Sequence, residues 1–294
     1  MGKKEKIPFF NRIPLTRIKL HIALLLYFLV KLIIRDDNRV ICRNGIRYKI
    51  DLSEGIDFSL FLFASYQRHI TQSSLFSLEK DAVFFDVGAN IGSMTLRFAQ
   101  IAPDGHVYAF EPTSYAFTKL RRNLSLNPTL SNHISPIQVF ISDQCVNQSQ
   151  LQAYSSWKIN GSFVEGQHPL HGGTLKSGSE NEIIPAITLD SFCNEVKLDR
   201  LDCLKIDTDG HELKVLRGAT QTLKKYRPII IFEIGLYIIR EQSLEFRDYY
   251  EFLTRHGYVL YNSKNNHIVD MGNFTRQIPL YYTTDLVAIY SEKH

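Results

Sequence analysis

The sequence predicts an α/β fold in which a mostly parallel sheet carries helices on both faces. Three observations predict it. Strand and helix patterns alternate along most of the chain, which is typical of parallel sheets. An apolar strand at 82–87 leads into a glycine turn and a helix at 92–101, an arrangement that lets a ligand approach the backbone closely. The next strand, 106–111, ends on Glu111, whose carboxylate can accept the hydroxyls of a ribose.

The chain divides into three parts, of which the last carries this pattern. With 294 residues and 44% hydrophobic residues, it can bury the core of one large domain. We expect a basic and apolar helix within 1–38, a hairpin and a helix within 39–80, and the α/β domain over 81–294. Residues 40–50 alternate around an Asn-Gly pair, which predicts the hairpin, and the pattern of 58–78 is helical.

The elements of the α/β domain follow from the lengths and periods of its apolar runs. Pro228 marks the end of one helix and the start of the strand after it. The last two strand patterns have no helix between them, so we expect them to run antiparallel. The predicted strands lie near 82–87, 106–111, 137–141, 201–207, 228–233, 258–261 and 286–290, and the predicted helices near 92–101, 113–126, 188–196, 211–225 and 244–256.

One long segment, 155–182, interrupts the alternation of strands and helices. It is rich in Gly, Ser, His and Asn, and we interpret it as a loop insertion after the third strand. Loops of this length in a compact domain are usually functional or disordered. Two interpretations stay open, namely a lid over the substrate and a surface loop with no role.

The turn from Gly88 to Gly92 indicates which nucleoside the domain binds. A dinucleotide-binding turn has a glycine in its middle that makes room for a pyrophosphate, whereas this turn has Asn90. Asp86, two residues before the turn, would repel a pyrophosphate but suits a ligand with an ammonium group. S-adenosylmethionine has an ammonium, a sulfonium and no phosphate. The D-x-G-x-N-x-G pattern resembles the first motif of the class I methyltransferases.

The ends of the other strands supply further candidates. In open α/β sheets, ligands bind beyond the carboxyl ends of the strands, where the strand order reverses. Ser142 and Asp143 follow the third predicted strand, where a carboxylate can accept a hydrogen bond from an adenine amino group. The predicted cofactor-binding residues are Asp86, Gly88, Asn90, Gly92, Glu111, Ser142 and Asp143.

The segment around the fourth predicted strand indicates the protein family more specifically than any single acidic residue does. Residues 201–219, with Arg227-Pro228 and Phe232-Glu233 after them, resemble the signature of the FkbM family of methyltransferases. The resemblance implies a Rossmann-like, seven-stranded class I methyltransferase domain and S-adenosylmethionine-dependent transfer of a methyl group to a hydroxyl oxygen. Two departures concern the substrate site: the D-x-E-G of the family is D-T-D-G at 207–210, and its tyrosine-glutamate pair is Tyr66-Gln67.

Methyl transfer to an alcohol depends on aligning the acceptor oxygen, the methyl carbon and the sulfur. A general base helps because an alcohol is a weak nucleophile. Asp207 is the first candidate base, because the fourth predicted strand adjoins the first. His211, in the helix that follows, is the second candidate base, with a solvent-facing histidine as the alternative. Glu233, which ends the fifth strand, is the third predicted catalytic residue. Asp207, Asp209 and Glu233 could instead hold a divalent cation such as magnesium, which their spacing alone does not establish.

The basic residues are concentrated at the N-terminus. Residues 1–35 contain eight Lys and Arg against the single acid Glu5, whereas the remaining residues contain 26 against 29. We therefore expect no nucleic-acid-binding surface on the folded domain. The apolar stretch at 18–34 is short and interrupted for a spanning helix and lacks the cleavage site of a signal peptide. Attachment to a membrane surface and packing on the domain or on a second subunit both stay open.

Four scattered cysteines without a C-x-x-C pair indicate reduced thiols and a cytoplasmic protein. The leading prediction is O-methylation of a sugar, glycan or polyketide-like metabolite, with N- or C-methylation as its neighbour, and a homo-oligomer is compatible with the sequence. Two other classes stay open. A nicotinamide-dependent oxidoreductase is disfavoured by Asp86 and Asn90, and a non-catalytic nucleoside-binding module is disfavoured by the intact acids at the strand ends.

Overall fold

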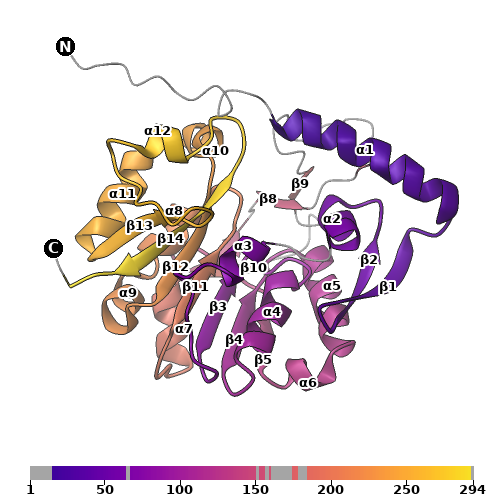
Figure 1. Cartoon of the computed structure of the whole chain (residues 1–294). Coiled ribbons are helices and arrows are strands. Elements are labelled where there is room, and N and C mark those ends of the chain that lie inside the picture. Colours follow the sequence, from indigo (N-terminus) through magenta and orange to yellow (C-terminus); the bar gives the residue numbers. More distant parts are fainter. Residues whose placement is uncertain are drawn as a thin grey trace, which may run out of the picture.

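A central sheet positions the candidate site. Figure 1 shows the computed structural model, which describes residues 15–63, 67–149, 152–155, 159, 174–177 and 184–292. Seven of the described strands form the sheet, in the order β13-β14-β12-β11-β3-β4-β5. Their bounds are β3 Val83–Val87, β4 His106–Phe110, β5 Ile134–Ile137, β11 Cys203–Ile206, β12 Ile229–Ile234, β13 Tyr258–Asn262 and β14 Thr284–Tyr290.

Among these seven strands, β14 alone runs against its neighbours. It pairs antiparallel with both β12 and β13, whereas β12, β11, β3, β4 and β5 pair in parallel. The predicted fold class, a mostly parallel seven-stranded sheet with an antiparallel C-terminal strand, is confirmed. The chain adds β4 and β5 on one side of β3 and then adds β11 and β12 on its other side, so the strand order reverses between β3 and β11. Ligand sites in such sheets lie at this reversal.

Helices cover both faces of the sheet (Figure 1). Successive side chains of a strand point to opposite faces, and Phe84 and Phe85 of β3 accordingly belong to two separate buried clusters. Helices α4 Ser93–Ile101 and α5 Ser114–Ser125 pack on the Phe84 side. On the Phe85 side lie α7 Leu189–Glu195, α8 Glu212–Arg217, α9 Thr220–Tyr226 and α11 Phe246–Arg255. Three short helices complete the domain: α6 Pro128–Ser131, α10 Leu236–Glu241 and α12 Phe274–Gln277.

The N-terminal part packs beside this domain. The predicted hairpin is confirmed: β1 Asn38–Arg43 pairs antiparallel with β2 Ile46–Asp51 around Asn44 and Gly45, which both have a positive φ, as tight hairpin turns require. The helix predicted over 58–78 is instead two short helices, α2 Gly55–Phe63 and α3 Arg68–Thr71. The long helix α1 Leu15–Ile33 precedes them and lies along the outside of α2 (Figure 1).

A buried group of three charged residues, which we call the Lys119 cluster (Glu54, Asp57 and Lys119), ties the start of α2 to α5. Lys119 Nζ lies 2.8 Å from Glu54 Oε2 and 2.6 Å from Asp57 Oδ2. Burial raises the pKa of Asp57 to about 6, and the Lys119 ammonium opposes this rise. Tyr115 also donates a hydrogen bond to Glu54. The cluster is a charged contact between elements, and its three residues are absent from the described lining of the pocket discussed below.

Two elements of the domain differ from the prediction. The third core strand is β5, Ile134–Ile137, rather than 137–141; its Pro136 weakens the strand pattern but is tolerated because β5 is an edge strand. Of the predicted stretch, Phe140–Ile141 forms β6 in a smaller sheet with β10 Ile184–Ile187 and β7 Val146–Ser149. The helix predicted over 211–225 is two helices, α8 and α9, because Gly218 interrupts it against the backbone of Ser142.

Most of the predicted insertion at 155–182 lies outside the described residues. Within it the structure describes Ile159 and the strand β9, Thr174–Ser177, which pairs antiparallel with β8, Gln152–Ser155. The lid interpretation and the domain boundaries stay predictions. Within the described ranges, none of the helices has the length and apolar content needed to cross a bilayer.

Candidate active site

A pocket opens at the carboxyl ends of β3, β4 and β11, where the strand order reverses. The turn after β3, the residues after β4, the region of β6 and the segment after β11 together form its walls. The lining includes six residues named from the sequence: Gly88, Asn90, Glu111, Asp207, Asp209 and His211.

Gly88 lets two neighbouring strand ends approach each other. Its φ is +81°, and a Cβ atom at this position would lie 1.9 Å from the carbonyl oxygen of Asp207. The backbone N–H groups of Gly88 and Ala89 both donate to the carbonyl of Phe110, at 2.9 and 3.0 Å. A side chain at position 88 would therefore separate the β3 turn from the segment after β11, and with it two walls of the pocket.

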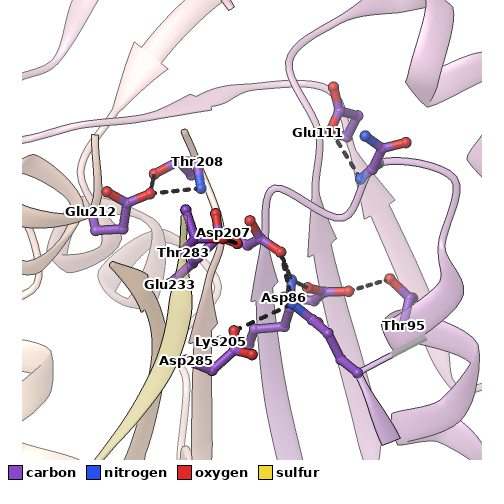
Figure 2. Close-up of polar contacts among 12 residues, drawn as sticks. Asp86, Thr95, Glu111, Lys205, Asp207, Thr208, Glu212, Glu233, Thr283 and Asp285 are labelled. Atoms are coloured by element: carbon purple, nitrogen blue, oxygen red, sulfur yellow. Dashed lines mark hydrogen bonds and ion pairs between the residues drawn. The ribbon is translucent and has the colours of Figure 1, made fainter. Parts of the chain in front are cut away.

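Glu111 is buried at the wall formed after β4. Its Oε1 accepts hydrogen bonds from Thr113 N at 2.9 Å and Thr113 Oγ1 at 2.5 Å. Its Oε2 accepts one from Asn90 N at 3.0 Å, the dashed line at Glu111 in Figure 2. A carboxylate offers about four acceptor sites, so one site on Oε2 stays free for a ligand. Burial raises the pKa of Glu111, and these three hydrogen bonds oppose the rise.

A second buried group, which we call the Lys205 cluster (Asp86, Lys205 and Asp207), lies at the strand reversal. Lys205 Nζ is 3.2 Å from Asp86 Oδ1 and 3.3 Å from Asp207 Oδ2 (Figure 2). Burial alone would lower the pKa of Lys205, but the two carboxylates outweigh burial and raise it. Thr95 Oγ1 donates to Asp86 Oδ2 at 2.6 Å. Asp86 thus has two protein partners and is absent from the described pocket lining, whereas Asp207 is part of it.

The segment after β11 is held by Glu212. Its Oε1 accepts hydrogen bonds from Thr208 N, Thr208 Oγ1 and Gly210 N, all within 3.1 Å. Asp209, within this segment, has a positive φ of 52°. Burial, followed by the charges of nearby carboxylates including Asp207, raises the pKa of Asp209 to about 8. At neutral pH Asp209 therefore retains its proton.

The two other predicted catalytic residues have different surroundings. His211 lines the pocket, with its ring edge-on against Phe140 and its Nδ1 3.3 Å from the carbonyl oxygen of Thr208. Burial lowers the pKa of His211, so its ring is neutral at neutral pH. Glu233 is outside the described lining and accepts a 2.6 Å hydrogen bond from Thr283 Oγ1. Burial and neighbouring carboxylates raise the pKa of Glu233 well above its ordinary value.

The predicted magnesium site finds no support in this geometry. Among the described residues, no group of three or more His, Cys, Asp and Glu side chains is arranged to hold a metal ion. Asp207, the first of the three predicted ligands, is already paired with Lys205.

Besides Asp86, three predicted cofactor residues lie beside the pocket rather than in its described lining. Gly92, with a φ of 85°, is the N-cap of α4. Ser142 follows β6, and its N–H donates to the carbonyl of Ile187. Asp143 accepts a hydrogen bond from Ser142 Oγ at 3.1 Å. Their roles toward a cofactor stay predictions.

Sequence reasoning missed four residues near Asp207, namely Lys205, Gln67, His69 and Asp285. A lysine inside the apolar strand Cys203–Ile206 was a usable signal, because a buried lysine needs charged partners. Gln67, which donates to Asp207 Oδ2 at 3.2 Å, was noticed only as a departure from the family pattern. His69 lies 2.7 Å from Asp285, and the 216 positions between them left no local signal.

With this geometry in view, comparison with known proteins decides the family. The model of the methyltransferase FkbM domain matches residues 86–260, more than half of the chain, from β3 through β13. The chain belongs to the FkbM methyltransferase family. This FkbM protein is therefore a member of a methyltransferase family whose motifs lie on the strand ends that form the pocket.

Individual relatives of this FkbM protein are distant. The 2-O-methyltransferase NoeI of Sinorhizobium fredii is 28% identical over 51% of this chain and 63% of its own length. The hexuronic acid methyltransferase AglP of Haloferax volcanii is 29% identical over 52% of this chain and 56% of its own. The match thus spans less than two thirds of either relative. A solved structure of methyltransferase FkbM from Methylobacillus flagellatus gives a TM-score of 0.48 at 16% identity, over 75% of this chain and 47% of that one.

Proposed function

We propose that this protein uses S-adenosylmethionine to methylate a hydroxyl oxygen of a sugar, glycan or polyketide-like metabolite. The observation that carries the proposal is the pocket at the strand reversal, whose lining contains the carboxyl groups of Glu111 and Asp207. Such a wall repels a pyrophosphate and attracts a cation. The names of the relatives NoeI and AglP, a 2-O-methyltransferase and a hexuronic acid methyltransferase, support a hydroxylated acceptor.

The residues present fit this cofactor. Glu111 Oε2 retains one acceptor site for a ribose hydroxyl, and the left-handed Gly88 gives the ligand access to the backbone of the turn. Asp207 offers a carboxylate to the positive end of the molecule. S-adenosylmethionine, when bound, supplies a methyl group that its sulfonium activates. The contribution of the protein is then to hold the acceptor oxygen in line with that methyl group and to remove its proton.

Calorimetry and label transfer test this proposal together. We expect S-adenosylmethionine and S-adenosylhomocysteine to bind and NAD not to bind. Protein incubated with methyl-labelled S-adenosylmethionine and an extract of its own cells should pass the label to an alkali-stable ether. NAD binding, with no binding of the sulfonium compound, would favour the oxidoreductase instead. Cofactor binding without label transfer would favour the non-catalytic module.

The exposed apolar face of α1 supports attachment of the protein to a membrane surface. One side of α1 packs on the protein, where Tyr27 is buried and its hydroxyl donates to Asp37 Oδ1 at 3.1 Å. The opposite side is a stripe of large apolar residues, each at least half exposed: Ile22, Leu25, Phe28, Leu29, Leu32 and Ile33. A helix with one apolar face open to solvent binds in the plane of a membrane interface.

The charge of the N-terminal segment favours anionic lipid over a second protein copy as the occupant of this stripe. Eight Lys and Arg lie within residues 1–35 against one acid, and each basic residue near an anionic membrane adds about 1 kcal/mol of attraction. A self-contact through this face would instead bring two such basic segments together. We infer that α1 lies on the surface of an anionic bilayer, which would bring the pocket toward lipid-linked acceptors.

Vesicle sedimentation tests this attachment. We expect binding to vesicles of phosphatidylcholine with phosphatidylserine, weaker binding to phosphatidylcholine alone, and loss of binding in Leu29→Asp and Leu32→Asp variants. Ile268→Asp is the matched control, because Ile268 is 52% exposed but belongs to another surface. Equal sedimentation of Leu29→Asp and wild type would contradict the attachment. So would a wild-type dimer, with no affinity for vesicles, that the same substitution makes monomeric.

A further inference from the structure

A second group of polar side chains, which we call the His69 group (Gln67, His69 and Asp285), adjoins Asp207. His69 lies in α3, Gln67 directly precedes that helix, and Asp285 lies in β14. His69 Nε2 is 2.7 Å from Asp285 Oδ2. Gln67 Nε2 is 3.2 Å from Asp207 Oδ2 and 3.4 Å from Asp285 Oδ1. One amide nitrogen thus links a histidine–aspartate pair to a carboxylate that lines the pocket.

The His69 group contains an acceptor atom with no donor. Gln67 Oε1 is buried and, among the described residues, has no hydrogen-bond partner. Gln67 also has a φ of 48°, a left-handed conformation that glutamine rarely adopts. Both features are unfavourable in the protein alone, and strained or unsatisfied groups of this kind are concentrated at functional sites. A hydroxyl on a bound molecule would satisfy Gln67 Oε1.

The partner of His69 fixes which ring nitrogen can take up a proton. An ionised carboxylate only accepts hydrogen bonds, so we assign the ring proton of His69 to Nε2, which faces Asp285 Oδ2. Nδ1 then carries the free lone pair. The His69 side chain is 32% exposed, whereas that of Asp285 is 11% exposed, so a ligand has access to the ring while its partner is protected. A base oriented by a buried carboxylate is a common catalytic arrangement.

We propose that His69 is the general base of the methyl transfer and that Asp285 and Gln67 are positioning residues. This inference rests on the proposed function. The acceptor oxygen forms a bond to the methyl carbon while the bond from that carbon to sulfur breaks, and its electron pair stays on sulfur. The hydroxyl proton passes to His69 Nδ1. A second hydroxyl of the acceptor donates to Gln67 Oε1, so the acceptor is a molecule with neighbouring hydroxyls, such as a sugar ring.

The other charged groups around the His69 group are less suited to this step. Asp207 Oδ2 is already shared between Lys205 and Gln67. Glu233, which pairs in register with Asp285 across β12 and β14, already accepts a hydrogen bond from Thr283 Oγ1, and burial and neighbouring carboxylates raise its pKa. Of the acids and bases around Asp207 whose contacts the structure gives, His69 alone combines a partly exposed ring with a buried partner that orients it.

Substitution of His69 tests the base directly. We expect His69→Asn, whose amide can still donate to Asp285, to lower kcat about 10²- to 10⁴-fold in the label-transfer assay. Its affinity for S-adenosylmethionine, measured by calorimetry, should stay within about twofold, because His69 is outside the described lining of the pocket. Added imidazole should partly restore His69→Ala. The matched control is His106→Asn: His106 makes a 2.9 Å contact to Ser135 at the opposite end of the sheet and should leave kcat unchanged.

Nitrogen NMR of the histidine ring provides a readout that needs no acceptor. The wild-type protein should show His69 with its proton on Nε2, and Asp285→Asn should mix the two tautomers and lower kcat. Wild-type kcat in His69→Asn, or a proton on Nδ1 in the wild type, would overturn the proposal while leaving the methyltransferase intact. A wild-type protein that transfers no label would overturn both. Should His69→Asn fail to fold, the wild-type tautomer and the kcat of Asp285→Asn decide.

Discussion

The Lys119 cluster and the Lys205 cluster share their chemistry but differ in what surrounds them. Each is a lysine between two carboxylates, at distances of 2.6 to 3.3 Å. In the Lys119 cluster both carboxylates are closed off, with side-chain exposures of 2% and 0%. In the Lys205 cluster Asp207 is 18% exposed and lines the pocket. The comparison teaches that a buried ion pair becomes part of a site only where one member has access to a ligand.

The largest effect should come from removing each lysine. Lys205→Met leaves the buried Asp86 beside Asp207 without a cation between them, and we expect the free energy of unfolding to fall by about 3–5 kcal/mol, as when a buried pair is broken. Binding of S-adenosylmethionine should be lost as well. Lys119→Met should cost stability of the same order but leave cofactor affinity unchanged. Urea unfolding and calorimetry measure the two quantities, and a Lys119→Met protein that binds no cofactor would break the comparison.

Two glycines have the same φ of +81°, so comparing their alanine variants distinguishes the cost of backbone strain from the cost of crowding at the site. We expect Gly88→Ala to lower the free energy of unfolding by about 2–4 kcal/mol, because left-handed strain adds to a collision with the Asp207 carbonyl. Gly45→Ala in the hairpin turn should cost only about 1 kcal/mol, since the nearest atom there is Gln100 Nε2 at 3.6 Å. Equal losses in urea unfolding would show that crowding at position 88 contributes nothing.

Substitution of two buried glutamates, one at the pocket and one in the Lys119 cluster, should affect cofactor affinity differently. Glu111→Gln should weaken binding of S-adenosylmethionine about 10- to 100-fold, because it replaces a charged acceptor of ribose hydroxyls worth about 1.5–3 kcal/mol. Glu54→Gln in the Lys119 cluster should leave this affinity within about twofold and lower stability instead. Calorimetry at one salt concentration measures both variants. Unchanged affinity in Glu111→Gln would remove the ribose assignment.

The smallest change, taken over one pH unit, concerns the pH dependence of stability. Asp209 has a folded pKa of about 8 against an ordinary value of 3.8, so between these values the folded protein holds a proton that the unfolded chain has released. Stability therefore falls as pH rises across this window, by at most about 1.4 kcal/mol per pH unit for one group. For Asp57, with a pKa of about 6, the same fall ends near pH 6.

Thermal unfolding of Asp209→Asn and Asp57→Asn against pH tests this difference. Relative to wild type, Asp209→Asn should gain stability up to about pH 8, whereas the gain of Asp57→Asn should level off near pH 6. A constant difference between Asp209→Asn and wild type from pH 5 to pH 8 would show that Asp209 is ionised throughout.

The sequence by itself determined the order and type of the core elements, because hydrophobic period and glycine placement are local properties. The β3 strand, its turn, and Glu111 at the end of β4 follow from contiguous residues, and so does the family signature after β11. Element ends that depend on distant contacts were predicted less well. The break between α8 and α9 arises where Gly218 meets the backbone of Ser142, and β5 contains a proline that only its edge position tolerates.

Only the tertiary structure decided which charged groups are free and which are paired. Asp86 was expected to face a ligand, yet the fold gives it Thr95 and Lys205 as partners, since a buried carboxylate needs compensating charge and donors. The His69–Asp285 pair joins residues 216 positions apart, which no local pattern can reveal. Composition and period describe neighbours along the chain, whereas proton positions and acceptor sites depend on neighbours in space.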